Sequence, residues 1–94
     1  MPLDPMQLAA LAAVLRRGSF EHAATDLAVT PSAISQRIKA LEERIGTALV
    51  LRATPCTATP TGARLAKHAE DVGLLETQLR RDLELDSENS PARL

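Results

Sequence analysis

The sequence predicts a mainly α-helical domain that carries one short β-hairpin. The chain has 94 residues, which is room for one domain. It contains one Phe and neither Trp nor Tyr, so its core must be built from Leu, Ile, Val and Ala. Such a core favours packed helices over an all-β fold, which normally uses aromatic and β-branched residues. Three pairs of a capping residue and a proline mark helix starts: Asp4-Pro5, Thr30-Pro31 and Thr59-Pro60.

The first two helices are predicted between Asp4 and Gly18 and from Ser19 to about residue 29. Asp4 caps the first helix, and Gln7 stands at the spacing of a capping box. Apolar residues follow at helical spacing: Leu8, Leu11, Ala12 and Leu15. The second helix has its own apolar stripe: Phe20, Ala23, Ala24 and Leu27. Its two alanines are small enough to let another helix approach closely.

The third helix begins after Thr30 and ends at Gly46. Its buried face is predicted to consist of four residues at helical spacing: Ile34, Ile38, Leu41 and Ile45. The opposite face is polar: Ser32, Ser35, Gln36, Lys39 and Glu43. The apolar run 49–51 is too short for a helix, residues 52–56 form a turn, and 57–58 return as a strand. A small hairpin is therefore expected here.

A long helix is predicted from Pro60 to about Leu85, with Gly62 allowing close backbone packing. Its apolar stripe is longer than a compact bundle of this size covers, which favours a dimerisation seam: Leu65, Ala69, Val72, Leu75, Leu79 and Leu83. The alternative is that the stripe completes the core of the monomer. Gly73 weakens the helix, which a close helix crossing would rationalise. Residues 86–94 are expected to form a flexible polar tail.

The net charge of −1 is unevenly distributed. Residues 16–64 hold seven Arg and Lys against four Asp and Glu, whereas the remainder holds four against eight. A basic middle is compatible with a nucleic-acid face, although chance solvated charge explains a small excess equally well. No signal peptide or apolar membrane span is present, which predicts a cytoplasmic protein without a membrane partner.

Catalytic and metal sites are not expected. The lone Cys56 has no Cys or His cluster around it, so no metal or other cofactor is predicted, and it is expected to pack in the hairpin rather than act as a redox switch. His22 and His68 are expected to be surface or helix-face residues. Glu42 and Glu43 diverge by about 100° on a helix and have no nucleophile nearby, so we reject an enzyme.

Two helices joined by a short turn, followed by a hairpin, form a candidate winged helix-turn-helix. In such motifs the second helix presents its N-terminal residues to base edges in the major groove. That end also carries partial positive charge and free N–H groups, which favour phosphate. Short polar side chains suit this role, because Gln can bond adenine through two hydrogen bonds and Ser can bond several bases.

The combination of residues resembles the N-terminal domain of LysR-type transcriptional regulators. The resemblance covers about residues 4–85 and rests on a set of motif positions: Ala23, Ala24, Leu27, Val29, Thr30, 32–38, Leu41, Glu42, Gly46, Leu49, Arg52, Thr59 and Gly62. The family usually has Ser-Arg-Gln after the turn, whereas this chain has Ser35-Gln36-Arg37. That order, together with residues 52–56 and 58–59, is similar to the lysine- and arginine-responsive branch, whose members control basic amino-acid export.

The resemblance implies a role for each matching position. Four residues fall where the family reads bases: Pro31, Ser32, Ser35 and Gln36. Four fall where it grips the DNA backbone: Thr30, Arg37, Lys39 and Arg52. For Lys39 the alternative is pairing with Glu42 or Glu43, which lie three and four residues further on. The expected partner is a double-stranded site with dyad symmetry.

The resemblance also implies a division of the chain. Residues 1–58 are expected to form the winged helix-turn-helix and residues 59–85 a linker helix that forms a homodimer. The family's effector-binding domain is absent, so the chain is expected to bind no effector. A competing hypothesis, from another class, is a helical protein–protein adaptor in which the long helix is the working part; the mild acidity of the chain favours it slightly.

Overall fold

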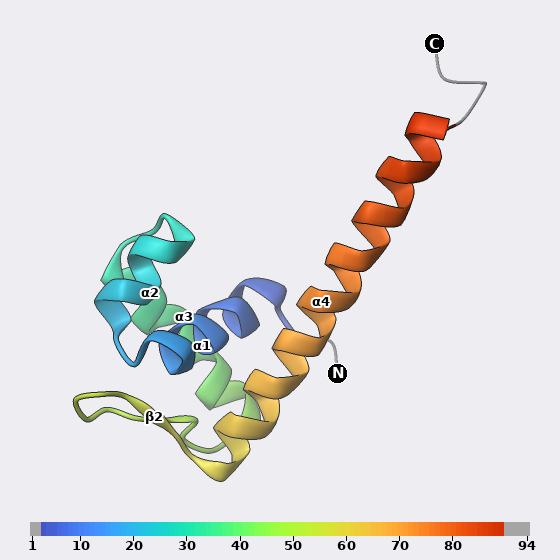
Figure 1. The fold of residues 1–94 in the computed structure, drawn as a ribbon. Helices are drawn as coiled ribbons and strands as arrows, with labels where there is room; N and C mark the ends of the chain where they lie inside the picture. Colours follow the sequence, from blue (N-terminus) through green and yellow to red (C-terminus); the bar gives the residue numbers. More distant parts are fainter. Residues whose placement is uncertain (1–2, 90–94) are drawn as a thin grey trace.

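The computed structural model describes residues 3–89, which form four helices and a two-stranded hairpin. The elements are α1 (Pro5–Arg17), α2 (Phe20–Leu27), α3 (Pro31–Ile45), β1 (Val50–Leu51), β2 (Thr57–Ala58) and α4 (Pro60–Asn89). The strands are antiparallel, with Val50 opposite Ala58. Helices α1, α2 and α3 form a bundle, the hairpin projects from it, and α4 runs past α1 and leaves the bundle as a rod (Figure 1). The predicted mainly α, winged helix-turn-helix fold is confirmed.

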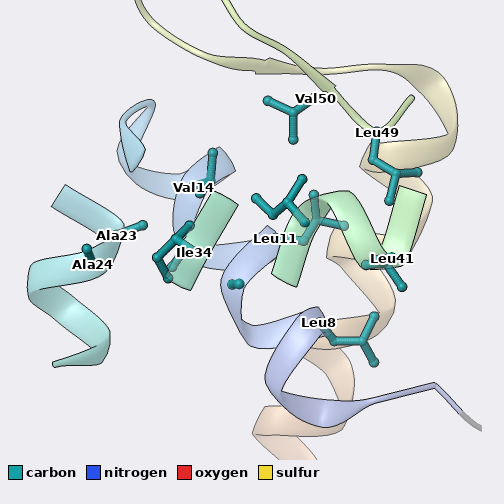
Figure 2. Packing of buried hydrophobic residues seen from close by; sticks show 12 residues of the cluster. Leu8, Leu11, Val14, Ala23, Ala24, Ile34, Leu41, Leu49 and Val50 are labelled. Carbon is teal, nitrogen blue, oxygen red and sulfur yellow. The ribbon is translucent and has the colours of Figure 1, made fainter. Parts of the chain in front are cut away.

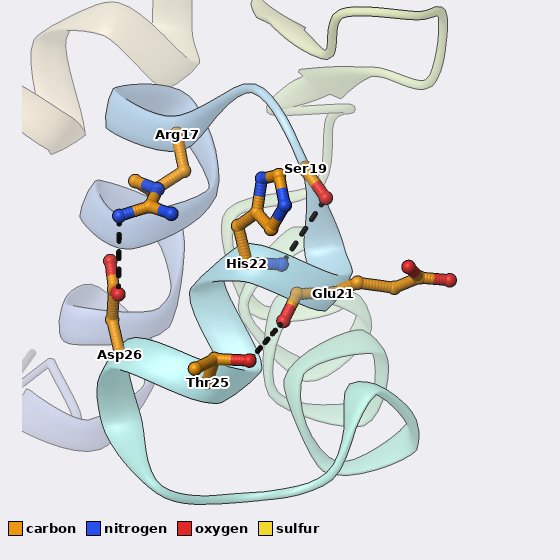
Figure 3. Close-up of polar contacts among 6 residues, drawn as sticks. All are labelled: Arg17, Ser19, Glu21, His22, Thr25 and Asp26. Atoms are coloured by element: carbon orange, nitrogen blue, oxygen red, sulfur yellow. Dashed lines mark hydrogen bonds and ion pairs between the residues drawn. The ribbon is translucent and has the colours of Figure 1, made fainter.

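The helix starts are capped by the predicted residues. The Asp4 side chain accepts a hydrogen bond from the Met6 N–H at 2.8 Å, and Thr30 Oγ1 accepts one from Ala33 at 3.0 Å. Ser19 caps α2 in the same way (Figure 3). These bonds satisfy N–H groups that have no partner within their own helix. The capping box at Gln7 is wrong, because the side-chain Oε1 of Gln7 is buried and has no hydrogen-bond partner among the described residues.

The turn between α2 and α3 is tight and hydrogen-bonded. Ala28 adopts a left-handed backbone conformation with φ of 57°, and its N–H donates to the carbonyl of Thr25. The Val29 N–H donates to the carbonyl of Ala24 at 3.0 Å. An exposed ion pair of 3.3 Å between Arg17 and Asp26 links α1 to α2 (Figure 3). Exposed pairs of this kind contribute about 0–1 kcal/mol, so the turn depends chiefly on packing and backbone bonds.

The core lies where the three bundle helices meet the start of the hairpin (Figure 2). Leu11, Ile34 and Leu41 are fully buried, and each comes from a predicted apolar stripe. Ala23 and Ala24 of α2 are buried as well, which allows α2 to pack closely on its neighbours. Cys56 is half-buried and packs against the same cluster, in agreement with the predicted packing role. The bundle therefore presents a rigid platform from which α3 and the hairpin project.

The base of the hairpin is attached to both α3 and α4. The Glu42 carboxylate accepts hydrogen bonds from the N–H groups of Leu49 and Val50, at 2.8 and 3.4 Å. Thr59 donates from its hydroxyl to Ala48 and from its N–H to Leu49, while its Oγ1 accepts from Gly62. The hairpin is thus oriented by bonds at its base.

Helix α4 is longer than predicted and partly free of the bundle. It extends to Asn89, four residues beyond the expected end at Leu85. No proline or glycine stands between those positions, and the first stop signal is Pro91, which disfavours helical geometry in the residue before it. The expected tail is therefore helical over 86–89, and 90–94 lie outside the described residues. The close crossing expected at Gly73 is wrong for the protomer, because a Cβ there would meet nothing within 4 Å.

Within residues 3–89, no helix is long and apolar enough to cross a membrane.

Candidate nucleic-acid interface

Helix α3 presents a polar face to solvent at its N-terminal end. Pro31, Ser32 and Gln36 are exposed, and Ser35 is half-exposed at the edge of the same face. The opposite face is held in the core by Ile34, Ile38 and Leu41. The apolar stripe thus orients the helix so that the predicted base-reading residues point outward together.

The start of α3 is electrostatically suited to an anion. Proline at the first position has no N–H, and the Ala33 and Ile34 N–H groups donate to Thr30. The exposed Ser32 is the remaining residue of the first turn with an N–H directed out of the helix start. Helix N-termini carry about half a positive charge, which favours phosphate oxygens. Thr30 uses its oxygen for the cap, so its hydroxyl hydrogen remains a donor.

The hairpin places Arg52 beside this face. The Nη1 of Arg52 lies 3.5 Å from the Oγ of Ser35, a long hydrogen bond between residues 17 apart in sequence. The guanidinium carbon of Arg52 lies 4.6 Å from the centre of the Phe20 ring, in a cation–π contact. The wing, α3 and the start of α2 therefore meet at one guanidinium.

The other two cations predicted to hold the DNA backbone lie differently. Lys39 is exposed on the polar face, and neither of its glutamate neighbours forms an ion pair with it within the described part of the chain. Glu42 is instead used at the hairpin base. Arg37 is half-buried and stands about 160° around α3 from Ser35, because successive residues turn by about 100°. The fold brings Lys39 and Arg52 to the polar face and places Arg37 on another flank.

The predicted seam on α4 has two parts. Leu65 and Ala69 pack against the core of the protomer, as the alternative hypothesis for the stripe proposed. The remainder is exposed: Val72, Leu75, Leu79 and Leu83. Between these parts a groove of about 530 Å³ runs between α1 and α4, lined mainly by Leu3, Pro5, Leu8, Ala9, Ala12, Ala69, Val72 and Gly73. His68 and Glu76 lie at the same groove.

Two residues with a role at this surface were not found by sequence reasoning. Phe20 was assigned to the apolar stripe of α2, and only its status as the sole aromatic of the chain distinguishes it. Glu42 was considered only as an acid–base candidate or a partner for Lys39. Its bonds to Leu49 and Val50 depend on how the chain returns after α3, which no local pattern reveals.

A polar recognition helix, a preceding helix at a tight turn and a wing on the same side define a winged helix-turn-helix domain. Residues 5–63 match the sequence profile described as bacterial regulatory helix-turn-helix protein, lysR family. The chain therefore belongs to the LysR family of bacterial regulators, as the resemblance predicted. This family is one of transcription regulators, which agrees with the rejection of an enzyme.

Relatives and solved structures agree with this assignment. The chain is 55% identical over 76 residues to the HTH-type transcriptional regulator LysG of Mycobacterium bovis, covering 81% of this chain and 25% of the relative. It resembles full-length LysG from Corynebacterium glutamicum with bound effector Arg, with a TM-score of 0.88, 38% identity, and coverage of 95% and 31%. It also resembles the BenM DNA-binding domain in a complex with catB site 1 DNA, with a TM-score of 0.85, 25% identity, and coverage of 94% and 99%.

The chain thus spans about a quarter of the length of the LysG relative that it matches. The similarity to LysG supports the predicted branch of the family.

Proposed function

We propose that this chain is the sequence-specific, double-stranded DNA-binding domain of a LysR-type regulator that controls basic amino-acid export or metabolism. The observation that carries the proposal is the exposed polar start of α3 with Arg52 of the wing beside it. The similarity to a DNA-bound BenM domain supports the partner, and the similarity to LysG supports the regulated process. Such a regulator acts on DNA, and hence in the bacterial cytoplasm.

In the proposed complex α3 enters the major groove. Pro31, Ser32, Ser35 and Gln36 contact base edges, because they occupy the N-terminal, outward part of the helix. Thr30, Lys39 and Arg52 contact phosphates, which set the register without reading sequence. Arg37 is the fourth proposed backbone contact, from the flank of α3.

A homodimer formed through antiparallel α4 helices is part of the proposal. The exposed leucines of α4 and the groove beside α1 form a continuous apolar surface of a kind that marks interaction sites. A symmetric dimer places its two α3 helices on two half-sites, so the proposed operator has dyad symmetry.

The first experiment is a salt titration of binding to a random-sequence duplex pool, followed by sequencing of the retained fraction. A steep salt dependence with enrichment of a palindromic site is expected. The enriched site then serves as the operator in all further experiments. Absence of binding at low salt would contradict the proposal and favour the protein–protein adaptor.

Replacing Gln36 with alanine is expected to weaken binding to the enriched site by about 1–3 kcal/mol and to relax specificity at one base pair. The reason is that a side chain on the outer face of α3 bonds a base edge without supporting the core. The measurement is affinity for the site and for its single-base variants. Gln78→Ala, the same change on exposed α4, is the control. Equal weakening on every sequence would contradict a base-reading role for Gln36.

Replacing Arg52 with alanine is expected to weaken binding to all sequences about equally and to reduce the slope of log affinity against log salt by about one unit. The physical reason is the loss of one released counterion at a phosphate. Binding is measured at several salt concentrations on the enriched site and on a scrambled duplex. Arg81→Ala, on exposed α4, should leave the slope unchanged. A loss confined to the enriched site would count against a backbone contact.

A further inference from the structure

Arg52 is the only described cation that is held by side chains from two other elements at the candidate interface. Its guanidinium lies over the Phe20 ring of α2, with 4.6 Å from Cζ to the ring centre, and its Nη1 lies 3.5 Å from Ser35 Oγ of α3. Cations within about 6 Å of a ring centre are attracted by the negative face of the ring. The guanidinium is therefore oriented on a surface where an exposed arginine would otherwise sample many rotamers.

We propose that Phe20 is a positioning residue for DNA binding: its ring holds Arg52 beside Ser35, so that the wing cation and the recognition helix meet the duplex as one unit. This inference rests on the proposed function. Ordering a long side chain on binding costs conformational entropy, and an arginine that is ordered before binding avoids part of that cost. The contact thus raises affinity without Phe20 touching DNA.

The position of Phe20 makes this arrangement possible. The residue is the first of α2, directly after the Ser19 cap, and it is half-buried, packed against the edge of the core. One part of the side chain is thereby fixed by the core while the ring remains accessible to Arg52. Leucine at this position retains the apolar packing but has no π face, and tyrosine retains the face.

The contact is measurable before any DNA is added. Phe20 is the only Phe, Tyr or Trp of the chain, so the ring of no such residue other than Phe20 can shift the Arg52 side-chain protons by ring currents. We expect these protons to lie upfield in the wild type and in Phe20→Tyr, and to return to ordinary positions in Phe20→Leu. Ordinary positions in the wild type would overturn the inference directly.

The role in binding is tested by a double-mutant cycle on the site enriched from the duplex pool. Phe20→Leu is expected to weaken binding about two- to fivefold, the range of an exposed cation–π contact. In the Arg52→Ala background the same change should have no effect, because the side chain that it positions is absent. Phe20→Tyr should bind like the wild type.

The remaining outcomes separate the inference from simpler explanations. Leu27→Ala, which removes core packing from the same helix, controls for loss of stability, and thermal unfolding is measured for every variant. An equal effect of Phe20→Leu with and without Arg52 would show a merely structural role and overturn the inference alone. Absence of sequence-specific binding by the wild type would overturn the proposed function, and this inference with it.

Discussion

Replacing Leu79 with glutamate is expected to convert the proposed dimer into a monomer and to weaken operator binding by about 100-fold or more. Leu79 is 58% exposed on the apolar surface of α4, beyond the part of the helix that packs on the core. A carboxylate buried in an apolar interface loses its hydration without gaining a partner, which prevents association. Each monomer then binds a single half-site, and the gain from two linked sites is lost.

The measurements are sedimentation, thermal unfolding and affinity for the enriched site. Leu74→Glu is a closely matched control, because Leu74 is also 58% exposed on α4 but lies about 140° around the helix from Leu79. We expect Leu74→Glu to leave the dimer intact and both variants to retain the monomer fold. An unchanged sedimentation of Leu79→Glu would refute the seam, and an equal effect at Leu74 would show that the interface is not confined to this face.

Replacing Gly62 with alanine is expected to destabilise the fold by about 3 kcal/mol, at the upper end of typical overpacking penalties. A Cβ on Gly62 would overlap the carbonyl oxygen of Leu49 and lie 2.8 Å from its carbonyl carbon. Leu49 is fully buried and bonded to Glu42 and Thr59, so its backbone has no room to withdraw. The strain therefore falls on the junction of the hairpin with α4.

The control is Gly73→Ala in the same helix. A Cβ at Gly73 meets nothing within 4 Å in the protomer, so this change should raise stability by about 0.5–1 kcal/mol through helix propensity. Urea unfolding is followed at one low protein concentration, because association would otherwise alter the apparent stability. Wild-type stability in Gly62→Ala would contradict the close approach that the structure shows.

The local features of the fold could be predicted because each depends on neighbouring residues. A cap before proline marks the starts of α1, α3 and α4, and apolar residues at helical spacing identify the faces that enter the core. The prediction at Gln7 failed because a capping-box spacing permits a reciprocal bond without requiring it. The end of α4 was misplaced because a polar composition was taken as a stop signal, whereas backbone propensity allows the helix to continue.

Part of the candidate interface could be predicted for the same reason. Ser32, Ser35, Gln36 and Lys39 share a face because α-helical periodicity relates residues on one helix. The assignment of DNA roles to them came from the resemblance to the LysR family. Arg37 shows the limit of a motif taken as a string, since its position next to Gln36 in sequence leaves it on another flank of α3.

The long-range contacts depended on the packing of the bundle. Sequence patterns describe periodicity within an element, whereas the meeting of Arg52 with Phe20 and Ser35 joins three elements. The same holds for Glu42 at the hairpin base, and for the division of the α4 stripe between core and surface. Residue type and spacing thus account for the helices, their buried faces and the family. Which side chains meet across elements follows from the tertiary arrangement, because the angle and distance between packed helices depend on all of their contacts together.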